Sequence, residues 1–159
     1  MKRAALARYR QLPAAERRAT LRAGILLPAF SVAIRIRALE QLIPLVGLHQ
    51  VNLAESQATD PTAASVDPGR EYAEQVSRAV SRVAGRTPWT STCLAQALAG
   101  ARLLHDAGLV ATITLGVAKP DESTKTSDAL LAHAWLDSNG VSVTGGTEAT
   151  TYTPVGRFS

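Results

Sequence analysis

Two residues of this chain have side chains that could together carry out acyl transfer. Cys93 is the single cysteine among 159 residues, and His133 is one of three histidines. A lone cysteine with a histidine elsewhere is typical of a catalytic thiol, although an inert buried cysteine gives the same pattern. In such a pair the imidazole takes the thiol proton, the thiolate attacks a carbonyl, and the imidazolium protonates the leaving amine. We therefore predict Cys93 as the nucleophile and His133 as its base.

Cys93 stands where a helix is expected to begin. The hydroxyl side chains of residues 90–92 can cap a helix that runs from Cys93 to about Ala107 and ends at Gly108. The free N–H groups and the positive end of the helix dipole favour a thiolate at that position. The same N–H groups suit an oxyanion hole. This position favours a reactive cysteine over an inert one.

His133 lies in a predicted strand, 131–137, whose other residues are mostly apolar. A histidine in such a strand is often a core residue with satisfied ring nitrogens, so a structural role is the alternative. Trp135 falls on the same strand face and either walls a site or packs the core. The other histidines are less suitable, because His105 is on the polar side of its helix and His49 follows the N-terminal helical region.

The elements around this pair predict an α+β fold. The expected elements are a helix over 70–84, the helix that opens at Cys93, and strands over 111–117, 131–137 and 141–144, with an extended piece near 152–155. Alternating apolar and polar residues indicate the first of these strands, and Asn139-Gly140 is a strong hairpin signal. The strands should form a small antiparallel sheet on which the helices pack. A polar loop over 119–127 should lie near the site and either contacts a peptide or is merely mobile.

The chain divides into a helical N-terminal region (1–53), a polar linker (54–69) and the unit that carries Cys93 and His133 (70–159). After Pro28 the apolar residues recur near helical spacing up to Pro44, where the helix should kink or end. The apolar run from 25 to 34 is too short to span a bilayer, which needs about 20 apolar residues. We therefore predict that this run forms a buried or interfacial helix.

Charge and composition restrict the classes of function. The formal net charge is +4, and nine of the basic residues fall within the first 37 positions. Such a region can meet nucleic acid, an anionic membrane or an acidic partner, or can simply be a solvated face. A single cysteine permits no internal disulfide and fits the cytoplasm, and no clean signal peptide is present. The sequence shows no metal cluster, P-loop or dinucleotide fingerprint, so no cofactor is expected.

Several blocks resemble one family in order and spacing. The run 93–117, which opens with Cys-Leu and ends in Gly-Val, is followed by the block Ala132–Asp137 and by Asn139-Gly140. These blocks resemble the transglutaminase-like leader peptidases of lasso-peptide biosynthesis, and the resemblance covers about residues 89–158.

The resemblance implies a transglutaminase- or papain-like core and a cysteine peptidase with Cys93 and His133 as its catalytic pair. The enzyme would remove the leader from a ribosomally made lasso precursor peptide. The helical N-terminal region is similar to that of stand-alone members, which rely on a separate leader-recognition protein and pass the freed core peptide to an ATP-using lasso cyclase. We expect the N-terminal helices to dock one of these partners or the membrane face, and no nucleic acid. The alternatives are a transamidating acyl transferase with the same pair and a non-catalytic partner-binding protein.

The chain departs from the family pattern at the third catalytic position. The family places an aspartate about twelve residues after the histidine, where this chain has Gly145. Asp137 cannot replace it, because four residues along a strand put it about 13 Å from His133. An orienting group should instead come from the return strand: the Thr144 hydroxyl, a backbone carbonyl, or Glu148 if the chain bulges at the two glycines.

Overall fold

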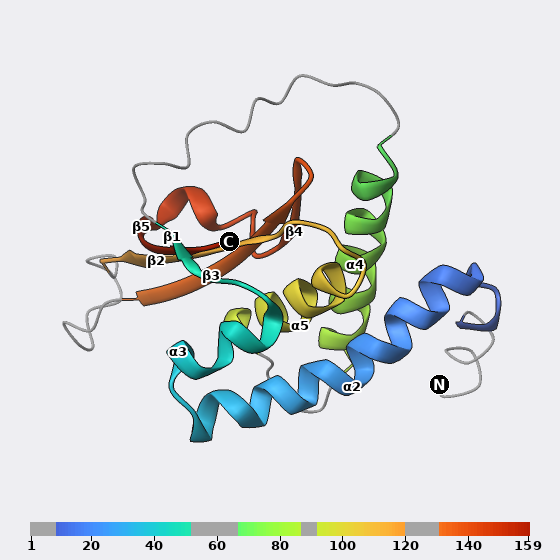
Figure 1. The fold of residues 1–159 in the computed structure, drawn as a ribbon, viewed down its shortest axis with the longest axis horizontal. Coiled ribbons are helices and arrows are strands. Elements are labelled where there is room, and N and C mark those ends of the chain that lie inside the picture. Colours follow the sequence, from blue (N-terminus) through green and yellow to red (C-terminus); the bar gives the residue numbers. More distant parts are fainter. Residues whose placement is uncertain (1–8, 52–66, 87–91, 120–130) are drawn as a thin grey trace.

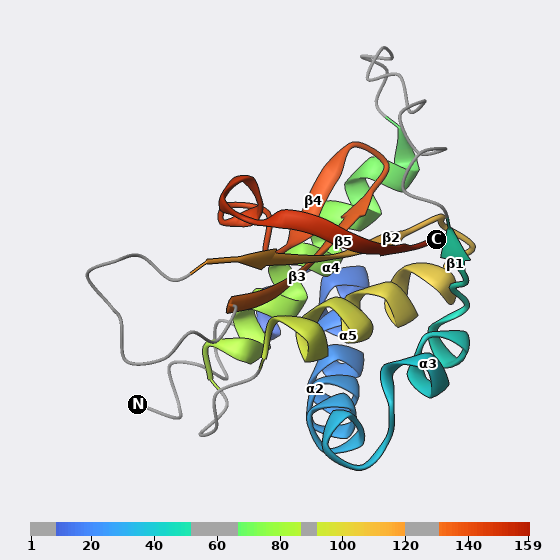
Figure 2. The same ribbon diagram turned by 90° about the vertical axis from the view of Figure 1, so that its left-hand side faces the viewer.

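The computed structural model describes residues 9–51, 67–86, 92–119 and 131–159. Most of the expected linker and of the polar loop at 119–127 lies outside these ranges. The described elements form three layers, in which helices α4 (Pro68–Ala84) and α5 (Cys93–His105) separate a sheet from helix α2 (Ala14–Ile36) (Figures 1 and 2). The Cys93 end of α5 therefore lies between the sheet and the N-terminal helices.

The sheet has five strands, all antiparallel, in the order β1-β5-β2-β3-β4. The strands are β1 (Gln50–Val51), β2 (Thr112–Ala118), β3 (Leu131–Ser138), β4 (Val141–Thr144) and β5 (Thr153–Phe158). Asn139 and Gly140 both have positive φ, 48° and 69°, as a two-residue hairpin turn between β3 and β4 requires. The predicted α+β class and hairpin are confirmed. The two-residue strand β1, too short to give a periodic signal, was not expected.

Helix α2 is a single helix of 23 residues that passes through Pro28. Proline removes one backbone hydrogen bond and crowds the carbonyl four residues earlier, which here belongs to Gly24. Gly24 is exposed, so water can satisfy that carbonyl without breaking the helix. The helix is consequently longer than the apolar run 25–34. By length and composition alone the whole helix could cross a membrane, although the apolar run 25–34 by itself is too short, as expected.

The expected helix from Pro28 to Pro44 was also wrong, because the chain leaves helical geometry at Arg37. Arg37 is extended, with φ −130° and ψ 145°, before the short helix α3 (Leu39–Leu42) and the 3₁₀ turn η1 (Pro44–Val46). The break lets Leu42 and Val46 fold back and become buried, which a straight helix would not allow. Gly47 (φ 77°) ends the segment as predicted, whereas Pro44 follows the end of α3 and is the first residue of η1.

The core is one continuous cluster that includes α2, α4, α5 and the sheet. Many of its helical residues are alanines, so the helices approach one another closely. At Gly100 an added Cβ would lie 2.6 Å from Leu136, which explains how tightly α5 lies on β3. The α2 side chains Ala23 and Leu27 are fully buried in the same cluster. The N-terminal helices therefore support the element that carries Cys93.

Candidate active site

Cys93 is the first residue of α5, as the capping pattern predicted. The Thr92 hydroxyl accepts a hydrogen bond from the Ala95 amide at 3.2 Å, which fixes the start of the helix at the cysteine. The Cys93 side chain is partly exposed rather than sealed in the core. Within the first turn, the Cys93 and Leu94 amides have no acceptor inside the helix. The position combines an accessible sulfur with N–H groups available to a developing oxyanion.

His133 lies on β3, and one of its ring nitrogens is fixed by the backbone. Nε2 is 2.9 Å from the carbonyl oxygen of Gly145. A carbonyl oxygen can only accept a hydrogen bond, so Nε2 must carry the proton of the neutral ring. Nδ1 is then the unprotonated nitrogen. This contact selects the tautomer in which Nδ1 can act as a base.

Gly145 lies twelve residues after His133, at the position where the resemblance led us to expect an aspartate. Its backbone φ is +72°, a conformation that residues other than glycine rarely adopt. A Cβ added there would lie 2.9 Å from His133 Nε2 and 2.7 Å from the Ala134 carbonyl oxygen. The glycine therefore allows the main chain itself to reach the imidazole. Of the three candidate orienting groups, the backbone carbonyl is the one that contacts His133; the buried Thr144 hydroxyl has no hydrogen-bond partner among the described residues.

Two aromatic side chains stack on the His133 ring. Tyr152 stacks on it with ring centroids 4.9 Å apart, and Trp135 with centroids 6.1 Å apart. Gly116, opposite His133 in the sheet register, makes room for both, because a Cβ there would lie 2.8 Å from each of them. Trp135 was expected on this face. Tyr152 was not singled out, and its position after the return strand, in a chain with only three tyrosines, was the available signal.

Cys93 and His133 line the same pocket, which has a volume of about 410 Å³. The remaining lining is mainly apolar and comes from α2, α3, α5 and the sheet; it comprises Ile34, Leu39, Thr92, Leu94, Leu115, Gly116, Val117, Ala132, Ala134 and Val155. Ile34 and Leu39 show that the N-terminal helical region supplies part of the wall. An apolar wall beside a thiol and an imidazole is suited to holding a peptide carbonyl out of bulk water.

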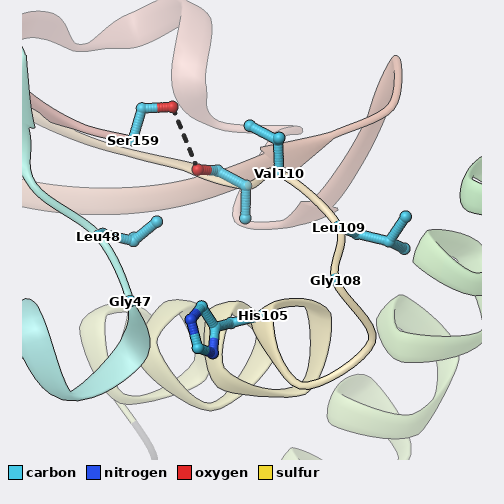
Figure 3. Close-up of a pocket in the computed structure, with 8 residues that line it drawn as sticks. Gly47, Leu48, His105, Gly108, Leu109, Val110 and Ser159 are labelled. Atoms are coloured by element: carbon cyan, nitrogen blue, oxygen red, sulfur yellow. Dashed lines mark hydrogen bonds between the residues drawn. The ribbon is translucent and has the colours of Figure 1, made fainter.

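The other histidines are not part of this pocket. His105 lies at the opposite end of α5, twelve residues from Cys93, or about 18 Å along the helix. Its ring covers Gly47 beside a separate pocket of about 300 Å³ (Figure 3). His49 is exposed, and its backbone pairs with Ser159. Neither can serve as a base for Cys93.

Asp137 does not orient His133, as its distance along the strand predicted. Burial raises the pKa of the Asp137 carboxyl, although a hydrogen bond from Ser142 and the charge of Arg157 oppose that rise. Its partners thus lie at the hairpin end of the sheet. Within the described residues, no group of three or more His, Cys, Asp or Glu side chains is placed to hold a metal ion.

A comparison with protein-family models identifies this architecture. The model of the transglutaminase-like superfamily matches residues 26–157, which is most of the chain. The chain belongs to the transglutaminase-like superfamily. Such proteins are typically cysteine proteases or transglutaminases, so the fold is of a type that carries thiol-dependent acyl transfer. The family match begins inside α2, consistent with a helix that belongs to the same core. No curated protein and no solved structure matched the chain significantly.

Proposed function

We propose that this superfamily member is a cysteine peptidase in which Cys93 attacks a peptide carbonyl and His133 is the general base. The observation that carries the proposal is the pocket that both side chains line, with the His133 tautomer set by the Gly145 carbonyl. The unprotonated Nδ1 would accept the thiol proton. The thiolate would then form the acyl-enzyme, and the same Nδ1–H would protonate the leaving amine before water hydrolyses the thioester.

The first turn of α5 would stabilise the charge that develops on the attacked carbonyl oxygen. The Cys93 and Leu94 amides are suited to this, because the Ala95 amide is taken by the Thr92 hydroxyl and the Gln96 amide by the Thr92 carbonyl. Removal of one such donor from an oxyanion hole typically costs about 10²–10³ in rate. The helix start thus has two roles in the proposal, activating the thiol and binding the oxyanion.

The substrate that we propose is the leader–core junction of a ribosomally made lasso precursor peptide. Support comes from the sequence blocks at 93–117 and 132–140, which resemble the stand-alone leader peptidases of that pathway. On this proposal a separate leader-recognition protein presents the precursor in the cytoplasm, and a lasso cyclase takes the freed core. The partly open apolar pocket is compatible with an extended peptide laid across Cys93.

Mass analysis of a precursor peptide incubated with the protein and the leader-recognition protein tests this function. We expect two products whose masses sum to the precursor plus one water. The Cys93→Ala variant should give none, and cleavage by that variant would rule out the proposal. Addition of a primary amine separates hydrolysis from transamidation, because a product carrying the amine would identify a transamidating acyl transferase instead.

Thiol labelling tests the Cys93–His133 pair without any substrate. A small alkylating probe should label Cys93 rapidly at neutral pH, and His133→Ala should slow the labelling about tenfold or more, because no base then assists the thiolate. His105→Ala is the matched control and should label like the unmodified protein. Slow labelling of all three proteins would instead indicate an inert cysteine in a non-catalytic member of the fold.

A further inference from the structure

Helix α2 has an outward face that is unusually apolar for an exposed surface. Leu21, Ile25, Val32 and Ile36 are 59%, 72%, 60% and 73% exposed. Their spacings of 4, 7 and 4 residues put all four on one side of the helix, and we call this set the outer stripe. It extends about 22 Å along the helix axis. Four large apolar side chains in a continuous row differ from singly scattered exposed residues and indicate an interaction surface.

The opposite side of α2 packs in the core. Ala23 and Leu27 are fully buried against α4 and α5, and Glu16 pairs with Arg82 at 2.7 Å. Withdrawing α2 to cross a bilayer would expose this side and break that ion pair. The long apolar helix is therefore held in place, and none of the residues that the structure describes covers the outer stripe.

Every charged side chain of α2 other than Glu16 is basic, and the exposed Glu40 follows on α3. Glu16 is the only acidic residue in the first 39 positions, and it is turned inward. Arg18, Arg35 and Arg37 are exposed near the two ends of the stripe, and none makes an ion pair within the described part of the chain. Arg22, by contrast, is paired with Asp106. Unpaired arginines beside exposed apolar residues match the composition of helices that lie in an anionic membrane surface.

A shallow hollow brings the two features together. It has a volume of about 320 Å³ and is lined by Pro28, Ser31, Val32 and Arg35, so a stripe residue and a guanidinium share its wall. The Ser31 hydroxyl already donates a hydrogen bond to the Leu27 carbonyl. The Arg35 guanidinium is therefore the polar group of the hollow that is available to bind a ligand. A lipid phosphate at Arg35 with its acyl chain along Val32 would satisfy both parts of this surface.

We propose that α2 lies flat on an anionic membrane surface, with the outer stripe in the headgroup–acyl boundary and Arg18, Arg35 and Arg37 on lipid phosphates. The orientation leaves the active-site pocket free, because Ile34 faces that pocket while Ile36 belongs to the stripe. The proposal does not depend on peptidase activity. It would place the reaction of Cys93 at the membrane.

Vesicle flotation of the full-length protein tests the proposal. We expect binding to vesicles of phosphatidylcholine with phosphatidylglycerol, little binding to phosphatidylcholine alone, and weakening as salt rises. Ile25→Glu with Val32→Glu, or Arg35→Glu with Arg37→Glu, should weaken binding about tenfold or more. Val110→Glu, at an equally exposed valine (74%) outside α2, is the matched control and should bind normally.

Thiol labelling of Cys93 verifies the fold of each variant, and it should not change because none of the substituted residues lines the active-site pocket. Absence of binding to anionic vesicles, or undiminished binding of the stripe variant, would overturn the proposal. So would a stable complex with the leader-recognition protein or the cyclase that the stripe substitutions abolish without vesicle binding, because the outer stripe would then be a protein interface.

Discussion

At the scale of single residues, the site orients its imidazole with the main chain in place of a carboxylate. The Gly145 carbonyl bonds His133 Nε2, and Tyr152 and Trp135 stack along the ring. A carbonyl fixes the tautomer as a carboxylate does, but it carries only a partial charge and stabilises an imidazolium less. The His133 ring is thus oriented, with weaker electrostatic support for its charged form than a carboxylate would give.

Replacing Gly145 by an aspartate, the residue that the resemblance led us to expect there, should impair the proposed peptidase activity. A side chain at 145 collides with His133 Nε2 and the Ala134 carbonyl oxygen and strains a residue with φ +72°. We expect kcat/KM of Gly145→Asp to fall by about 100-fold or more, measured on the precursor peptide. Gly24→Ala is the matched glycine control, because an added Cβ there contacts nothing within 4 Å, and it should retain full activity. An increase in activity of Gly145→Asp would show that the backbone rearranges to build a triad.

At the scale of elements, the start of α5 and the β3–β4 hairpin position the two reactive side chains. The Thr92 cap fixes where α5 begins, and therefore the surroundings of the Cys93 sulfur. The hairpin turn at Asn139-Gly140 brings Gly145 back toward His133, helped by a register shift between Leu136 and Asp137. Local rules of capping and turn formation thus set most of the site geometry.

Removal of the Thr92 cap should loosen the helix start. Thr92→Ala is expected to lower the free energy of unfolding by about 1 kcal/mol, measured by denaturant titration. The same substitution should slow the alkylation of Cys93, because the first-turn amides are then less well aligned. Thr92→Ser keeps the capping oxygen and should restore both properties. Equal labelling rates in the unmodified protein and the two variants would show that the reactivity of Cys93 does not depend on the cap.

Asp137 gives the hairpin a pH dependence whose sign follows from its environment. Burial raises the pKa of this carboxyl in the folded state, despite the hydrogen bond from Ser142 and the charge of Arg157. A raised folded pKa means that the contribution of Asp137 to stability is fully present below the ordinary aspartate pKa of 3.8 and declines as pH rises through the folded pKa. The ionised Asp137 therefore destabilises the folded state at neutral pH.

Asp137→Asn should accordingly stabilise the protein at neutral pH, because the amide oxygen can still accept from Ser142 without the cost of a buried charge. The gain in Tm, measured by thermal unfolding at pH 7, should shrink as the pH is lowered toward the ordinary range of an aspartate. A gain that is larger in acid than at pH 7 would contradict this assignment.

At the scale of the whole molecule, α2 joins the N-terminal region to the superfamily core. Glu16 is only 8% exposed and bonds Arg82 at 2.7 Å, while Arg82 also bonds the Thr20 hydroxyl. This nearly buried ion pair links α2 to α4. Removing either member leaves the other charge without a partner, which lowers the stability of the folded state. The outer face of the same helix is exposed, as the proposed membrane contact requires.

Substitution of Glu16 should therefore weaken the whole fold. We expect Glu16→Gln to lower the free energy of unfolding by roughly 1–3 kcal/mol, measured by denaturant titration, because Arg82 loses its charged partner. Glu74→Gln is the matched control. Its ion pairs with Arg70 and Arg78 are exposed and should contribute less than about 1 kcal/mol. Equal losses in the two variants would mean that α2 is held by apolar packing alone.

The sequence by itself determined the elements whose causes are local. The cap before Cys93, the Asn139-Gly140 turn, the strand β2 and the stop at Gly47 all depend on neighbouring residues, and each was predicted correctly. Cys93 could be named as a candidate nucleophile because a helix start and a lone cysteine coincide there, and the structure confirms the helix start. The continuation of α2 through Pro28 was not, because it depends on solvent reaching the exposed Gly24 carbonyl.

Only the tertiary structure decided how the site is completed. The group that orients His133 is a backbone carbonyl, which every residue type possesses, so sequence could name it among three alternatives without selecting it. Tyr152 reaches His133 across the sheet, and Ile34 reaches the pocket from a helix almost 60 residues before Cys93. These contacts depend on how the layers pack. The candidate pair Cys93 and His133 could therefore be named from local pattern, whereas the backbone partner of His133 and the walls of the shared pocket were set by long-range packing.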